Sequence, residues 1–231
     1  VNSDKINQLI NLLSDETSLR TLDNLLCARL TGDFNYFKKI YNEKLFFPDN
    51  IFEFSDEETF LDAGAYRGEI IRLFINQVNG SFKKINAFEP DNSNYNYLNK
   101  NIKKWGIKDR CNVYNMALYN KNCNLDFNIS DIESQVERES NNGIKAVTID
   151  EFFDQEINTF IKIHVQGCEI NVLDGAKEII RENKPKLAVV INQKPKDLWL
   201  VPLKIKSINN NYRIHIRHHS VSSVYTVCYA T

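Results

Sequence analysis

The 231-residue sequence has no long run of uncharged apolar residues and no excess of charge of either sign. A membrane-spanning helix needs about 20 predominantly apolar residues, so no spanning segment is expected. With 29 basic against 30 acidic residues, the composition gives no general attraction to nucleic acid or to an anionic membrane. The sequence also shows no signal-peptide pattern, internal repeat or low-complexity linker. We therefore expect no nucleic-acid partner and no membrane span.

The five cysteines are scattered along the chain and never form a C-x-x-C pair. An odd number with this spacing argues against a disulfide framework and against a zinc site. It predicts a reducing, cytoplasmic location in which each cysteine is a small buried apolar side chain. The length of the chain fits one α/β domain with an added helical segment.

Glycine is scarce, but two glycines bracket a short turn within residues 60–68. An apolar run ends in Asp62, Gly64 and Gly68 enclose the turn, and apolar residues then recur at helical spacing. A strand, a glycine turn and a helix start form the nucleotide pocket at the carboxyl edge of many α/β sheets. Glycine there permits unusual dihedral angles and lets a ligand approach the bare backbone. The alternative is a turn that serves packing alone.

The turn lacks the middle glycine of the dinucleotide fingerprint, because Tyr66 stands at that position. Asp62 closes the strand, which suits a ligand with positive charge better than a diphosphate. S-adenosylmethionine carries an ammonium and a sulfonium and no phosphate. Glu89 ends the next predicted strand, where its carboxylate can accept both ribose hydroxyls, and Pro90 stops that strand. These features predict S-adenosylmethionine as the cofactor and disfavour a nicotinamide-dependent oxidoreductase.

Strand and helix patterns alternate after residue 57 and predict a doubly wound α/β fold with a sheet of seven strands. Its strands are expected at residues 59–63, 85–88, 111–115, 159–165, 186–191, 212–216 and 223–229, with short extra strands at 125–129 and 144–147. Helices are expected at residues 3–13, 14–32, 69–78, 93–105, 150–153, 169–183 and 197–208, the last one broken near Pro202. Residues 1–56 form the predicted N-terminal helical cap, and residues 57–231 form the predicted cofactor-binding domain.

Eight segments of the chain resemble the FkbM-type methyltransferases, and together they cover most of it. They are residues 13–16, 29–33, 60–68, 87–91, 148–152, 161–169, 173–176 and 217–220. The resemblance implies the Rossmann-like fold of class I methyltransferases. It also implies methyl transfer from S-adenosylmethionine to a hydroxyl of a sugar or glycosylated product, in bacterial surface-glycan biosynthesis.

The motifs and the resemblance together define a predicted site. Cofactor contacts are expected from Asp62, Gly64, Ala65, Tyr66, Gly68, Glu89, Pro90, Met116, Ala117, His164 and Val165. The hydroxyl acceptor is expected to contact Tyr36, Tyr41, Gln193, Lys194, His218 and His219. The sequence leaves the oligomeric state open.

The fourth core strand departs from the family pattern at its carboxyl end. His164 stands where relatives have an aspartate, and Gln166 stands where they have a glutamate. Hard cations prefer carboxylate oxygens, so no metal site is expected. We predict His164 and Gln166 as the catalytic residues, with His164 as a base and turnover rising through a pKa of about 6.5. Two alternatives stay open: a structural histidine, and a non-catalytic S-adenosylmethionine-binding module.

Overall fold

The computed structural model describes residues 3–126, 143–153 and 157–231, which fall into two compact units. The α/β unit comprises Phe54–Pro185, and the terminal unit comprises Val1–Glu53 together with Lys186–Thr231. The α/β unit contains four strands of the seven-stranded sheet, and the terminal unit contains the other three. The number of strands is the predicted one. The division into a cap of residues 1–56 and a domain of residues 57–231 stays a prediction.

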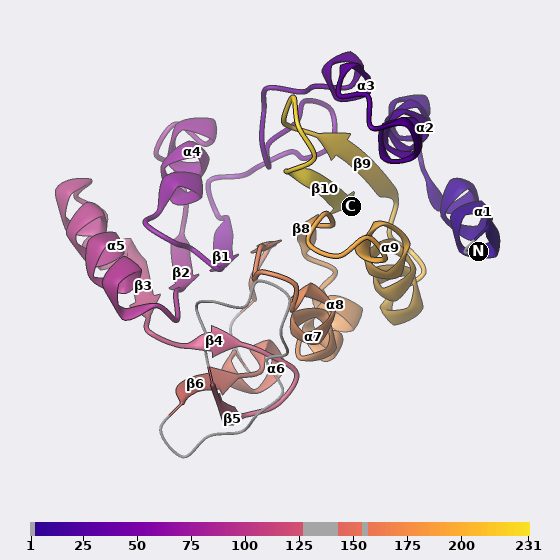
Figure 1. The fold of residues 1–231 in the computed structure, drawn as a ribbon. Coiled ribbons are helices and arrows are strands. Elements are labelled where there is room, and N and C mark those ends of the chain that lie inside the picture. Colours follow the sequence, from indigo (N-terminus) through magenta and orange to yellow (C-terminus); the bar gives the residue numbers. More distant parts are fainter. Residues whose placement is uncertain (1–2, 127–142, 154–156) are drawn as a thin grey trace. The chain divides into compact units, whose positions relative to one another are not determined.

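The α/β unit is built on four parallel strands in the order β3-β2-β1-β7. The strands are β1 (Thr59–Ala63), β2 (Lys84–Phe88), β3 (Cys111–Tyr114) and β7 (Phe160–Ile163). Every residue of β1 and β7 is buried, as expected for strands covered on both faces. Helices α4 and α5 lie on one side of these strands, and α7 and α8 lie on the other (Figure 1). These helices are α4 (Glu69–Gln77), α5 (Asn92–Lys104), α7 (Glu169–Asp174) and α8 (Lys177–Asn183).

A second, three-stranded sheet in the same unit has the order β4-β6-β5. Its strands are β4 (Ala117–Leu118), β5 (Cys123–Leu125) and β6 (Ile144–Val147). The 3₁₀ helix η1 (Lys108–Arg110) precedes β3, and α6 (Ile149–Phe152) follows β6. The strand predicted at residues 125–129 lies mostly outside the described residues, and β5 ends at its first residue.

The single helix predicted at residues 169–183 is wrong, because α7 and α8 are separate. A Cβ atom on Gly175 would lie 2.0 Å from the carbonyl oxygen of Tyr119, so another segment of backbone packs directly against the break. The carboxylate of Asp150 then caps α8 by accepting two backbone N–H groups of its first turn, at 3.1 and 3.0 Å. The apolar positions continue across the break, which is why periodicity alone predicted one helix.

The terminal unit contains an antiparallel set of strands in the order β8-β10-β9. Its elements are α1 (Ser3–Leu12), α2 (Glu16–Thr31), α3 (Asn35–Lys39), β8 (Lys186–Val190), α9 (Asp197–Ile208), β9 (Ile214–His218) and β10 (Thr226–Ala230). Helix α2 packs on β9, and α1 packs on α9. As predicted, α2 stops at Gly32, whose φ of 71° is left-handed, and β9 and β10 form a hairpin.

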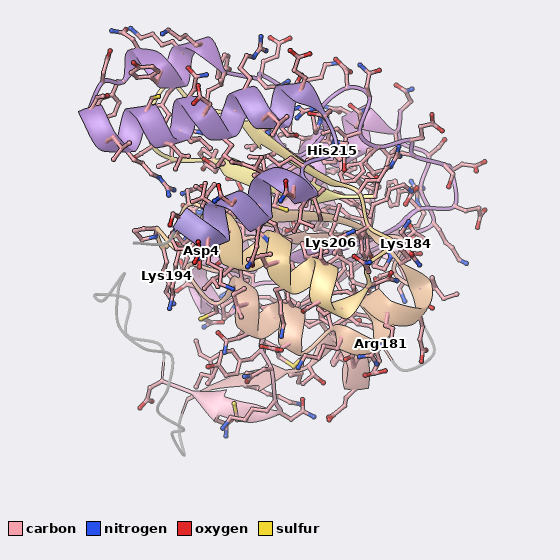
Figure 2. The ribbon with its side chains drawn as sticks, turned by 90° about the vertical axis from the view of Figure 1, so that its right-hand side faces the viewer. Asp4, Arg181, Lys184, Lys194, Lys206 and His215 are labelled. Atoms are coloured by element: carbon pink, nitrogen blue, oxygen red, sulfur yellow. The ribbon has the colours of Figure 1, made fainter. Side chains whose placement is uncertain are left out.

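Helix α9 runs unbroken through Pro202, so the predicted break there is wrong. A proline inside a helix removes one backbone hydrogen bond. Burial of Leu198, Val201 and Ile205 holds the helix together on both sides of it. Near its end, the Lys206 ammonium (labelled in Figure 2) donates to the carbonyl oxygen of Tyr212 at 3.0 Å. Across the described residues, no helix is both long enough and apolar enough to cross a bilayer.

Candidate functional site

The turn after β1 is held in place by the neighbouring strand β2. The backbone N–H groups of Gly64 and Ala65 both donate to the carbonyl oxygen of Phe88, at 3.1 and 2.9 Å. Gly64 and Gly68 have left-handed φ angles of 78° and 93°, and Tyr66 between them has a φ of 51°. The turn therefore has the unusual dihedral angles expected from its glycines.

Protein atoms fill the space beside both glycines. A Cβ atom on Gly64 would lie 2.0 Å from the carbonyl oxygen of His164, and one on Gly68 would lie 2.8 Å from Leu98 Cδ1. The missing side chains let the turn pack against the end of β7 and against α5. Packing therefore explains why both positions are glycine, and their contact with the cofactor stays a prediction.

Glu89 directly follows β2 and organises the rim of the turn. Its Oε2 accepts the N–H of Tyr66 at 2.7 Å, and its Oε1 accepts the N–H of Asp91 at 2.9 Å. The residue is 6% exposed, and burial raises the pKa of its carboxyl group although both backbone bonds oppose this. A carboxylate has about four acceptor positions, so two remain for hydroxyl groups. Two such acceptor positions match the two adjacent hydroxyl donors of a ribose.

Asn115 supports Glu89 from the end of β3 and was missed by the sequence analysis. Its Nδ2 donates to the carbonyl oxygens of Glu89 and Pro90, both at 3.0 Å. A polar residue at the carboxyl end of a predicted strand was the available signal, because parallel strands bring such ends to one edge of the sheet. Pro90 is half-buried in this segment.

Asp62 forms a buried ion pair below the turn. Its Oδ1 lies 2.7 Å from Lys162 Nζ, and the two side chains are 0% and 1% exposed. The same ammonium donates to the carbonyl oxygens of Gly64 and Ala63 at 2.8 and 3.3 Å, so its three N–H donors meet three oxygens. Burial raises the pKa of Asp62, and the Lys162 charge opposes that rise. Lys162 therefore balances the charge of Asp62, whereas the sequence alone suggests a positively charged cofactor as its partner.

Lys162 is a second residue that the sequence analysis missed. It lies directly opposite Asp62 in the register of β1 and β7. A signal was present, because each strand carries one charge among apolar residues and the two charges are of opposite sign. A buried charge requires a partner, so the two strands could have been paired through them.

The loop after β7 carries both predicted catalytic residues, and Glu169 fixes its backbone. Oε1 of Glu169 accepts the N–H groups of Val165 and Gly167, at 3.0 and 3.3 Å. Gln166 is exposed and has a left-handed φ of 55°. Val165 is half-buried beside it.

His164 is half-buried at the start of this loop and is neutral at pH 7. Burial, followed by the charge of Lys162, lowers the pKa of its imidazole to about 3. A base with so low a pKa removes a proton weakly at neutral pH. His164 therefore does not provide the predicted rise of turnover through pH 6.5, because its imidazole is already deprotonated there.

Comparison with known proteins places this geometry in a family. The sequence model of the family described as "Methyltransferase FkbM domain" matches residues 62–213, which include the glycine turn, Glu89 and the loop after β7. The chain belongs to the FkbM methyltransferase family. Members of this family are S-adenosylmethionine-dependent methyltransferases, so the predicted cofactor is confirmed.

Among solved structures, the methyltransferase FkbM from Methylobacillus flagellatus KT matches at a TM-score of 0.89 and 27% identity. The match covers 100% of this chain and 59% of that chain, so the FkbM chain described here spans about three fifths of that protein. Precorrin-6y C5,15-methyltransferase from Geobacter metallireducens GS-15 matches at a TM-score of 0.51 and 10% identity, over 78% of this chain and 82% of that one. A search of curated proteins gives no significant match. The predicted class I fold, with its seven-stranded sheet and helical N-terminal region, is confirmed.

Two further predicted cofactor contacts of the FkbM domain follow β3. Met116 is half-buried between β3 and β4. Ala117 begins β4 and is buried in an apolar cluster with Tyr119, Leu125 and Ala146. Like the other cofactor contacts, these two stay predictions.

The six predicted acceptor contacts all belong to the terminal unit. Tyr41 is 51% exposed, and Lys194 (labelled in Figure 2) is exposed in the turn before α9. Tyr36 is half-buried with the Lys39 ammonium 4.5 Å from its ring centre, and Gln193 is half-buried. Contact of these four side chains with the methyl-accepting substrate stays a prediction.

His218 has a structural role that differs from the predicted one. The buried imidazole uses both nitrogens, with Nδ1 2.9 Å from Thr226 Oγ1 and Nε2 2.8 Å from the carbonyl oxygen of Ser222. A carbonyl only accepts, so Nε2 is the donor and Nδ1 accepts the threonine hydroxyl. The ring also stacks on Phe37, with centres 4.9 Å apart. Neither nitrogen is left for a substrate.

His219 is likewise engaged at both nitrogens. Nδ1 donates to the carbonyl oxygen of Asn42 at 2.8 Å, and Nε2 accepts the Tyr229 hydroxyl at 2.7 Å. That hydroxyl in turn accepts the N–H of Phe46 at 3.1 Å. Burial lowers the pKa of His219 to about 4. His219 therefore joins the segment after α3 to β10 and does not fit the predicted acceptor contact.

Arg217 begins the segment of residues 217–220 that resembles the family, and it anchors α2 to β9. Asp15 Oδ2 lies 2.9 Å from Arg217 Nη2 and 2.5 Å from Nδ1 of His215, which is labelled in Figure 2. Although burial raises it, hydrogen bonds from Arg217, His215 and Ser18 hold the pKa of Asp15 well below its usual range. The motif at residues 217–220 therefore stabilises the terminal unit.

Proposed function

We propose that this chain transfers the methyl group of S-adenosylmethionine to a hydroxyl of a sugar or glycosylated product in bacterial surface-glycan biosynthesis. The observation that supports cofactor binding best is Glu89, a buried carboxylate with each oxygen fixed by one backbone N–H. Two acceptor positions of that carboxylate remain for a pair of hydroxyls. The cysteines at five positions are free thiols, which supports a reducing cytoplasm as the proposed location.

The chain's residues contribute mainly by binding and alignment. S-adenosylmethionine supplies a methyl group on a sulfonium, which is already an activated leaving group. The glycine turn and Glu89 orient the nucleoside, and the loop of residues 164–167 packs against the same turn through the His164 carbonyl. Alignment of reacting groups can supply a large part of a rate enhancement. That source suits a site whose imidazole is a weak base at pH 7.

We propose a reaction without a metal ion. Among the described residues, no group of three His, Cys, Asp or Glu side chains is placed to hold one. Turnover is therefore expected to persist in excess chelator. Loss of turnover that added Mg²⁺ restores would contradict this part of the proposal.

The acceptor is tested with methyl-labelled S-adenosylmethionine and a panel of neutral sugars, acidic sugars, amines and oligonucleotides. A methyl ether on a sugar hydroxyl, identified by mass spectrometry and NMR, is the expected product. Labelling of only the amine or the oligonucleotide would contradict the proposal.

The second candidate is a non-catalytic S-adenosylmethionine-binding module. It is favoured by the low pKa of His164 and by Gln166, an exposed amide where the family resemblance implies a carboxylate. Normal cofactor affinity with no transfer to any acceptor in the panel would support this module over the enzyme.

A further inference from the structure

Beside the glycine turn, the α/β unit holds an exposed arginine in a fixed position. The guanidinium carbon of Arg67 lies 5.1 Å from the ring centre of Tyr66 and 4.6 Å from that of Tyr97. Its Nε donates to Asn94 Oδ1 at 3.1 Å. Its backbone carbonyl accepts Asn101 Nδ2 at 2.9 Å. Two aromatic faces and two amide side chains thus restrain one side chain and its backbone.

The outer edge of this guanidinium stays available. A guanidinium has five N–H donors, and Asn94 takes the one on Nε. Within the described residues, no hydrogen bond engages the four donors on Nη1 and Nη2. Arg67 is exposed, and Tyr66 and Tyr97 are 49% and 48% exposed. Such a planar fork matches a carboxylate or a phosphate through two parallel hydrogen bonds. Because its rotamer is already restrained, the arginine loses little freedom when it binds.

The surroundings of Arg67 suit a sugar. Helix α5 has no acidic residue, and its Asn94 and Asn101 carboxamides both contact Arg67. Carboxamides both donate and accept, which matches hydroxyl groups. The exposed tyrosine rings offer flat apolar faces, and the Lys100 ammonium lies 5.5 Å from the Tyr97 ring centre and adds positive charge.

We propose that Arg67, Tyr66 and Tyr97 form an accessory subsite for an anionic sugar that carries a carboxylate or a phosphate. Tyr66 belongs to the glycine turn and donates its N–H to Glu89, so the subsite lies at the rim of the candidate cofactor site. The inference rests on the proposed sugar acceptor and deepens it, because it selects acidic glycans over neutral ones.

Direct binding measurements test the subsite without the methyl transfer reaction. Isothermal titration of the full chain compares a tetrasaccharide containing glucuronic acid, its carboxyl-reduced neutral form, and glucose 1-phosphate. We expect at least one anionic ligand to bind about tenfold more tightly than the neutral sugar, as a charge-assisted bidentate contact would provide. The two anionic ligands distinguish a carboxylate from a phosphate.

Three variants locate the contact. Arg67→Gln should remove the preference for the anionic ligand, and Arg67→Lys should keep only part of it, because the charge remains without the fork. Arg72→Gln is the matched control. It removes an exposed arginine of α4 that also faces an aromatic ring, Trp105, at 5.8 Å. This control should change the affinity less than about twofold, since Arg72 lies outside the tyrosine pair.

Four results would overturn the inference. They are unchanged anionic binding in Arg67→Gln, equal weakening in Arg67→Gln and Arg72→Gln, equal affinity for the neutral sugar, and tighter binding of a single-stranded oligonucleotide than of either anionic sugar. If Arg67→Gln lost S-adenosylmethionine binding and thermal stability, Tyr97→Leu would decide, because it leaves the Asn94 bond in place. Unchanged anionic affinity in Tyr97→Leu would then count against the subsite.

The outcomes also separate this inference from the proposed function. Methylation of a neutral sugar without anionic binding would refute the subsite and leave the proposed function intact. Binding of the anionic sugar without methyl transfer to any hydroxyl would support the subsite and refute the proposed function.

Discussion

At the scale of single residues, two buried carboxylates of the α/β unit have different partners. Asp62 meets the ammonium of Lys162, whereas Glu89 meets two backbone N–H groups. The ammonium balances the charge of Asp62, and the neutral partners of Glu89 leave its charge and two acceptor positions available. Glu89 is therefore the carboxylate that we expect to contact the cofactor.

Replacing Glu89 should weaken cofactor binding. Glu89→Ala removes the acceptor of the expected ribose bonds and leaves the N–H groups of Tyr66 and Asp91 without their partner. We expect a loss of about 1.5–3 kcal/mol in S-adenosylmethionine affinity by titration calorimetry, the range for bonds to charged groups. Asp109→Asn, in the exposed η1 segment, is the control. A similar loss in the control would contradict a specific role of Glu89.

Removing one member of the buried ion pair should destabilise the fold. Lys162→Met leaves the Asp62 carboxylate buried without its cation, which costs about 3–5 kcal/mol in buried pairs. Urea unfolding measures this free energy. The double variant Asp62→Asn/Lys162→Met should recover part of the loss, because it buries no charge. A single variant as stable as the wild type would show that the pair does not support the turn.

Turnover should show no midpoint near pH 6.5 if the pKa of His164 is about 3. The imidazole is neutral from pH 6 to pH 8, so its protonation state does not change in that range. NMR titration of the ring checks the pKa directly, and a pH profile of turnover checks its consequence. A rise centred near 6.5 in the wild type that disappears in His164→Asn would contradict the lowered pKa.

At the scale of elements, helix α8 depends on a cap supplied from another helix. Asp150, in α6, accepts two N–H groups of the first turn of α8. Asp150→Ala should lower the free energy of unfolding by about 1 kcal/mol, the usual cost of a lost cap. Asp150→Ser keeps an acceptor and should lose less. Equal losses in both variants would argue against capping.

Elements whose limits depend on nearby residues could be predicted from the sequence. Strand β1 and strand β6 have the predicted bounds, and α2 stops at the predicted glycine. The break at Gly175 could not be predicted, because it depends on the backbone of Tyr119 and on a cap from Asp150. Both partners are distant in sequence and leave no local periodic signal.

The candidate site divides in the same way. Glu89 was predictable because a strand end and a proline mark its position. The structural roles of His218 and His219 could not be predicted. They depend on hydrogen-bond partners that are distant in sequence, such as Asn42 and Tyr229 for His219. Two adjacent histidines in a terminal motif are the same in sequence whether they bind a ligand or each complete a buried hydrogen-bond network.

At the scale of the whole molecule, all four histidines are less basic than free imidazole. Burial lowers the pKa of His164, His215, His218 and His219. A neutral histidine in the fold and a protonatable one in the unfolded chain give stability that is complete above pH 6.5. This stability is lost as the pH falls from 6.5 toward the folded-state pKa, because the unfolded chain then binds more protons.

We therefore expect stability to fall between pH 7 and pH 5. The folded-state pKa values of His164 and His219 are about 3 and about 4. Each histidine should therefore lower the free energy of unfolding by about 2 kcal/mol by pH 5. Carboxyl groups with raised pKa, including that of Asp197, act in the opposite direction. Urea midpoints across this range measure the sum, and His219→Gln should flatten the slope. An unchanged slope in that variant would contradict the assignment.

The ion pair of Asp62 and Lys162 also constrains how this sequence can diverge. The two residues are 100 positions apart in the chain, yet a change at one leaves the other with an unbalanced buried charge. A lineage that lost one charge would have a less stable fold until the second charge was lost as well. Homologues should therefore retain both charges or neither, and single replacements should be rare.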